Sequence, residues 1–137
     1  MILIGIDPGT KTGVAVWDNE YRYFHEITTT GIFKALQMVL RMATYETAHL
    51  FIEDPNTWKP FGKDATNKLQ GAGSIKRDFA IWKEFCEDHN ISMTPIKLQG
   101  TAKKLKADFF QQLTKHKGRT DQHGRDAAML VFNRKAN

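Results

Sequence analysis

Two apolar runs in the first half of the chain end at acidic residues. Residues 2–6 are apolar except for one glycine and are followed by Asp7, and a second run over residues 49–54 closes with Glu53 and Asp54. Short apolar runs rich in β-branched side chains are typical of strands buried on both faces of a sheet. Each run is therefore predicted to be a central strand with acidic residues at its carboxyl end.

Three further segments have strand patterns. Turn residues at 8–13 separate the first run from residues 14–17, which predicts a hairpin. The alternating segment Tyr21–Ile27 is predicted as a third, antiparallel strand, and Ser92–Ile96 as a fifth strand near the end of the sheet.

Apolar residues recur at helical spacing in the remaining segments. They predict four helices: from Ile32 to about Tyr45, from Ala65 to Asp88, from Thr101 onward, and from near Gln122 to the tail. The second helix has its apolar residues at Ile75, Phe79, Trp82 and Phe85. The third has Leu105, Phe109 and Leu113 on its buried side. Helical connections between strands make those strands parallel. The fold class is therefore α/β, a single domain over residues 1–137 whose five-stranded mixed sheet has the order 3-2-1-4-5.

Charge and composition narrow the function classes. Twenty lysines and arginines against fifteen acidic residues give a net charge of +5, a balance that favours polyanions such as nucleic acid. One cysteine, Cys86, provides no disulfide and no cysteine-rich zinc site. The N-terminal apolar run is too short for a signal-peptide core, and no run approaches the ~20 residues of a membrane helix, so a cytoplasmic protein without a membrane partner is expected.

The predicted sheet brings candidate metal ligands together. Asp7 and Glu53 end adjacent parallel strands, and His123 and Asp126 lie three residues apart on one helical face. Mg²⁺ and Mn²⁺ prefer carboxylate oxygens, and two such ions ~4 Å apart can activate water and stabilise the leaving oxygen in phosphodiester cleavage. An alternative for each residue singly is a turn former, a strand terminus or a helix cap.

The motifs around these residues resemble those of the RuvC family of Holliday-junction resolvases, which belong to the ribonuclease H-like superfamily. Residues 4–10, with Gly13 opening the next strand, are similar to the family's first motif, and residues 52–53 to its second. Residues 123–128 resemble the third motif, and residues 69–73 the start of the family's long helix. The short chain favours a phage-like member.

The resemblance implies a homodimeric endonuclease that binds four-way or other branched DNA and cuts it with two Mg²⁺ or Mn²⁺ ions, leaving 5′-phosphate ends. It implies Asp7, Glu53, His123 and Asp126 as the catalytic ligands. Asp54 and Asp121 are close enough in sequence to be rival ligands, and we interpret both as supporting residues.

Several other residues are candidates for DNA contact. The lysines at 97, 103, 104 and 106 follow the fifth strand, where they can position a phosphate. Trp58 and Phe61 lie in a proline-containing loop after Glu53, where an aromatic ring can stack on an unpaired base. Their alternatives are a solvated helix face for the lysines and a core position for the rings.

Two other functions are open. One is an RNA-processing nuclease of the YqgF family, which resembles this chain less at Glu53 and in the His123–Asp126 pair. The other is a non-catalytic nucleic-acid-binding module, which the intact acidic set disfavours.

Overall fold

The strands form the sheet that the sequence predicts. A computed structural model describes residues 1–55, 65–98 and 104–135, with the side chains of 65–72 excepted. The strands are β1 (Ile2–Asp7), β2 (Lys11–Asp18), β3 (Tyr23–Gly31), β4 (Ala48–Glu53) and β5 (Ser92–Ile96). Their order is β3-β2-β1-β4-β5, with β1 antiparallel to β2 and parallel to β4. The order 3-2-1-4-5 and the mixed α/β class are confirmed.

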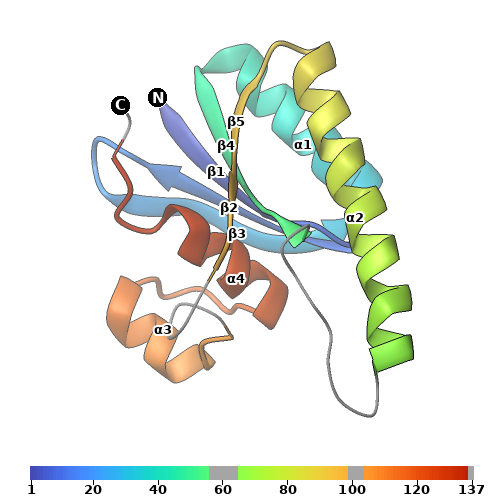
Figure 1. Ribbon diagram of the computed structural model, residues 1–137. Helices are drawn as coiled ribbons and strands as arrows, with labels where there is room; N and C mark the ends of the chain where they lie inside the picture. The colour runs from blue at the N-terminus through green and yellow to red at the C-terminus, as the bar shows by residue number, and fades with distance from the viewer. Residues whose placement is uncertain (56–64, 99–103, 136–137) are drawn as a thin grey trace.

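Helices cover both faces of this sheet. They are α1 (Ile32–Tyr45), α2 (Ala65–Asp88), α3 (Ala107–Thr114) and α4 (Gln122–Val131). Figure 1 shows α1 and α2 on one face of the sheet and α4 on the other, with α3 outside α4. Among the described residues, no helix is long and apolar enough to cross a membrane.

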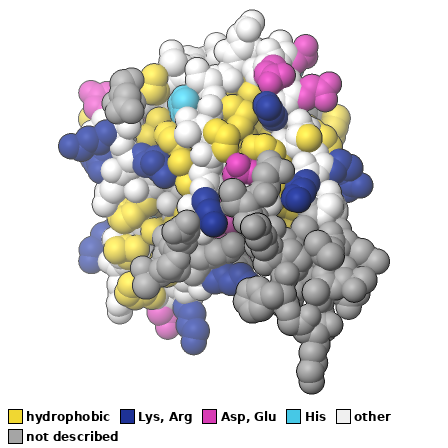
Figure 2. Space-filling view, in the orientation of Figure 1, with side chains coloured by type: hydrophobic (Ala, Val, Ile, Leu, Met, Phe, Trp, Pro, Cys, Tyr) yellow, Lys and Arg dark blue, Asp and Glu magenta, His cyan; other side chains and the backbone are white. Residues whose placement is uncertain are grey.

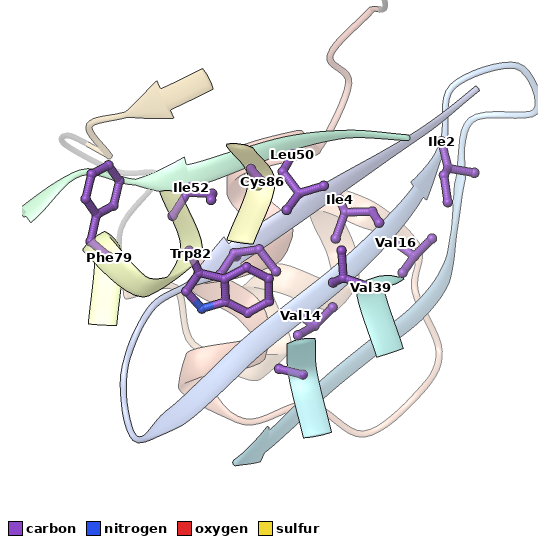
Figure 3. Packing of buried hydrophobic residues seen from close by; sticks show 12 residues of the cluster. Ile2, Ile4, Val14, Val16, Val39, Leu50, Ile52, Phe79, Trp82 and Cys86 are labelled. Atoms are coloured by element: carbon purple, nitrogen blue, oxygen red, sulfur yellow. The ribbon is translucent and has the colours of Figure 1, made fainter. Parts of the chain in front are cut away.

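The two faces have separate hydrophobic cores. Trp82 of α2 is fully buried and packs with Ile4, Val14 and Ile52 of the sheet, as Figure 3 shows. Trp17 belongs to the second core, beneath α3 and α4. Trp82 therefore has the core position that its helical spacing favoured.

Some element boundaries and burials differ from the sequence prediction. β3 begins two residues later than predicted and continues to Gly31. The third helix begins at Ala107 and not at Thr101, so Lys104 and Lys106 precede it and lie outside its predicted wet face. Thr101 and Lys103 lie outside the described residues.

The predicted buried faces of two helices are also wrong in part. Phe109 and Leu113 are exposed, while Leu105 and Phe110 fill the core. The helix begins six residues after the predicted cap, which changes which of its residues face inward. On α2, Ile75 is exposed and Phe79 is buried.

Candidate metal centre

Asp7 and Glu53 lie side by side at one end of the sheet. Asp7 is the last residue of β1, and Glu53 is the last residue of β4. The parallel register pairs Ile6 with Ile52, so the next residue on each strand is one of these two carboxylates. The sequence prediction that their strands end together is confirmed.

Glycines in β1 and β2 allow α4 to approach the sheet at backbone distance. A Cβ at Gly5 would come within 2.0 Å of the Ala127 carbonyl oxygen, and a Cβ at Gly13 within 2.0 Å of the His123 carbonyl oxygen. No larger residue fits at either position without moving the helix. These two glycines therefore set how close the helix that carries His123 and Asp126 lies to Asp7.

This packing places His123 against Asp7. The imidazole Nδ1 is 3.0 Å from Asp7 Oδ2, with the Asp7 side chain 13% exposed and the His123 side chain 50% exposed. Burial raises the pKa of Asp7 to about 7; the His123 hydrogen bond opposes this shift, while the negative charges of Glu53 and Asp126 add to it. The four predicted residues thus form one electrostatic cluster in which Asp7 lies at the centre.

Asp126 is held by two donors. Its Oδ1 accepts a hydrogen bond from the Lys104 backbone N–H and another from Gln122 Nε2, each at 3.0 Å. Asp126 is buried, and Lys104 has a positive φ of 58°. The peptide of Lys104 and the amide of Gln122 are contacts that the sequence reasoning missed; the i, i+4 spacing of Gln122 and Asp126 was the available signal for the second.

Asp121 caps α4. Its Oδ1 accepts hydrogen bonds from the Gly124 backbone N–H and the Thr29 hydroxyl. Burial acts to raise the pKa of Asp121, but these hydrogen bonds and the charges of His123 and Arg125 outweigh it, so the pKa is lowered. Asp121 thus has the structural role of capping α4.

Asp54 follows Glu53 and lies on the other side of the β4 end. Its backbone N–H donates to the Ile96 carbonyl at 2.8 Å, and it lines a hollow of about 370 Å³ between α2 and β5 together with Lys83 and Cys86. Asp54 does not contribute to the raised pKa of Asp7.

The arrangement of the chain is similar to that of a protein of known structure. A solved structure of RuvC from Thermus thermophilus superposes with a TM-score of 0.59 at 12% sequence identity, covering 96% of this chain and 92% of the other. The chain has a RuvC-like fold. No protein-family model matches the sequence, and no curated protein matches it. The likeness establishes the ribonuclease H-like fold.

In this RuvC-like fold the carboxylates interact electrostatically, but their oxygens are not arranged around a common metal position. Among the described residues, no three His, Cys, Asp or Glu side chains converge as ready ligands for a metal ion. In this arrangement His123 is hydrogen-bonded to Asp7, and one oxygen of Asp126 accepts hydrogen bonds from Lys104 and Gln122.

Three of the predicted DNA-contact lysines lie within the described residues. Lys97, Lys104 and Lys106 are exposed, and Lys97 follows the β5 residue that pairs with Glu53. Figure 2 shows Lys and Arg side chains on several sides of acidic atoms near the middle of one face. Trp58, Phe61 and Lys103 lie outside the described residues.

Proposed function

We propose that this chain is a metal-dependent endonuclease that cuts branched DNA, with Asp7, Glu53, His123 and Asp126 as its catalytic residues. The observation that carries the proposal is the grouping of Glu53, His123 and Asp126 around the Asp7 carboxyl, the pKa of which is raised to about 7. Carboxylates that repel one another in a buried position destabilise a fold, and a bound cation relieves that repulsion.

The donor set fits Mg²⁺ or Mn²⁺. Three carboxylates and one imidazole supply the oxygen-rich ligands that these ions prefer, and Asp7 is central among them. Metal binding requires the hydrogen bond between Asp7 and His123 to break. Both side chains can then serve as ligands. Two divalent ions in such a site polarise the phosphate and activate a water molecule.

The residues of the chain have distinct tasks in this reaction. Asp7 and Glu53, fixed at the ends of paired strands, would hold the divalent ions that bring the scissile phosphate and the attacking water together. Asp126 keeps a single orientation because Gln122 and the Lys104 peptide hold one of its oxygens. Attack by water with departure of the 3′ oxygen leaves a 5′-phosphate end.

The branched substrate and the dimer extend the proposal beyond the fold. The similar structure is described as RuvC, and a two-fold dimer would present two such sites to opposed strands of a junction. The net charge of +5 suits a DNA ligand. We propose that Lys97, Lys103, Lys104 and Lys106 contact phosphates and that Trp58 or Phe61 stacks on an unpaired base. With DNA as substrate, the single domain would act in the cytoplasm.

The test is a substrate panel with the purified protein. A labelled immobile four-way junction, the matching linear duplex and a structured RNA are each incubated with Mg²⁺, Mn²⁺ or EDTA. The proposal predicts metal-dependent nicks in the junction at a rate at least tenfold above the duplex. Preferential cutting of the RNA would favour the YqgF-like alternative, and binding without cutting in either metal would favour a non-catalytic module.

A further inference from the structure

The segment between α3 and α4 is strongly basic. Residues 115–119 read Lys-His-Lys-Gly-Arg, and the side chains of Lys115, Lys117 and Arg119 are exposed. Within the described part of the chain, none of these three cations forms an ion pair or a side-chain hydrogen bond. Three like charges this close repel one another, so this loop of residues 115–119 gains from an anionic partner.

The loop is anchored at three points. The Lys115 N–H donates to the Gln111 carbonyl at 2.9 Å, which ends α3 in a left-handed residue. In the middle, the ring of His116 packs edge-on against Phe24 of β3, with centroids 6.1 Å apart. Beyond Arg119, Arg125 donates to both oxygens of Thr120. The backbone that carries the three cations is therefore tied to α3, β3 and α4.

A groove lies between this loop and β3. It has a volume of about 440 Å³ and is lined by Thr28 and Thr29 on the strand side and by Arg119 and Thr120 on the loop side. The carboxylate in its lining, Asp121, already accepts hydrogen bonds from Thr29 and Gly124. The groove thus offers the guanidinium of Arg119 and the hydroxyl groups of Thr28 and Thr120, which are donors of the kind that bind phosphate oxygens.

The groove adjoins the candidate metal centre. Gly124 lines it, and the neighbouring residue is His123, which is hydrogen-bonded to Asp7. A strand with its scissile phosphate at Asp7 would continue past the α4 N-terminus into the groove. We propose that the loop of residues 115–119 and this groove bind the DNA sugar–phosphate backbone next to the cleavage position, an inference that rests on the proposed function.

The first test compares two pairs of substitutions that remove the same charge. Lys117→Gln with Arg119→Gln changes the loop, and Lys34→Gln with Arg41→Gln changes exposed residues of α1 on the opposite face of the sheet. Junction affinity is measured by fluorescence anisotropy in EDTA from 50 to 300 mM NaCl, with thermal unfolding as the check on folding.

The steepness of the plot of log K against log salt concentration should fall by about 1.8 when two phosphate contacts are lost. At 0.1 M salt this corresponds to a roughly 60-fold weaker affinity. We expect this change for the loop pair and less than a third of it for the α1 pair. Equal effects of the two pairs would overturn the inference, as would a wild-type protein that does not bind the junction.

The second test locates the contact. Cys86 is buried and burial raises the pKa of its thiol to about 11, so a new surface cysteine can be labelled selectively. A photo-cross-linker on Arg119→Cys should attach to nucleotides next to the cleaved phosphate, and the same label on Arg41→Cys should not. The opposite pattern, or cross-links scattered along the arms, would overturn the inference.

The first test runs in EDTA and needs no cleavage, so it separates the inference from the proposed nuclease activity. A junction-binding protein that uses the loop but never cuts would keep the inference and remove the proposed function. A protein that cuts the junction while the loop pair behaves like the α1 pair would do the reverse.

Discussion

Replacing Asp7 by Asn in the metal-free protein should change how stability depends on pH. The pKa of Asp7 rises from 3.8 to about 7, mainly through burial, with the charges of Glu53 and Asp126 adding to it against the His123 hydrogen bond. Since the folded-state pKa is above the unfolded value, the folded protein binds this proton more tightly, and stability is lost as pH rises from about 4 to about 7. At ~1.4 kcal/mol per pH unit, the loss approaches about 4 kcal/mol.

Asp7→Asn removes this loss because the amide carries no charge. The variant also gives up the hydrogen bond between the protonated Asp7 carboxyl and His123, worth about 0.5–1.5 kcal/mol. We therefore expect a variant with a stability close to that of wild type at pH 5 and a higher stability than wild type at pH 8. Urea unfolding in EDTA at pH 5, 6, 7 and 8 measures the difference.

Asp108→Asn is the matched control. Asp108 is an exposed carboxylate in the first turn of α3, so its replacement should shift stability by the same small amount at every pH from 5 to 8. Adding Mn²⁺ at pH 8 should stabilise the wild type and the Asp108→Asn protein but not Asp7→Asn. If the difference between Asp7→Asn and wild type is the same at pH 5 and pH 8, the carboxylate is not under electrostatic strain and the reasoning fails.

Two further substitutions test the supports of the site. Gly13→Ala should lower the free energy of unfolding by about 3 kcal/mol or more, since its Cβ would meet the His123 carbonyl oxygen, while Gly31→Ala, with open space around it, should cost under about 1 kcal/mol; equal losses by urea unfolding would contradict the packing. Gln122→Met should reduce Mn²⁺ affinity and cleavage about 10- to 100-fold by freeing Asp126, with little change in unfolding; wild-type cleavage kinetics in this variant would show that the amide does not position the carboxylate.

The sheet could be predicted because local and global signals agree in it. The apolar runs of β1 and β4 have buried central positions, and the helix between them makes the strands parallel, so their acidic ends meet. β3 was predicted too short because Thr28, Thr29 and Thr30 show no alternation of polarity, although threonine is a good strand former.

The start of α3 could not be read from periodicity, because a tertiary contact decides it. Lys104 takes a left-handed conformation and its N–H donates to Asp126, 22 residues later. Lys106 then has an extended backbone at the helix N-cap. The amphipathic pattern that begins at Thr101 contains no information about this long-range hydrogen bond. The prediction therefore placed Phe109 in the core, whereas the structure buries Phe110.

The residues of the candidate site could be proposed from the sequence, but the hydrogen bonds between them could not. Spacing alone grouped His123 and Asp126 on one helical face, and strand ends grouped Asp7 with Glu53. The hydrogen bond between His123 and Asp7 depends on the approach of α4 that Gly13 permits, which is a property of packing. The position of the basic loop of residues 115–119 beside the site depends on the fold, which a local charge pattern does not reveal.

The most direct test of the account is metal-dependent cleavage by site variants. Wild type, Glu53→Gln and Asp108→Asn are incubated with a 5′-labelled four-way junction in Mn²⁺, Mg²⁺ or EDTA, and the product ends are mapped. The account predicts nicks with 5′-phosphate ends in either metal for wild type and Asp108→Asn, none in EDTA, and at least a 100-fold lower rate for Glu53→Gln. Cleavage by Glu53→Gln at the wild-type rate, or equal cleavage in EDTA, would contradict it.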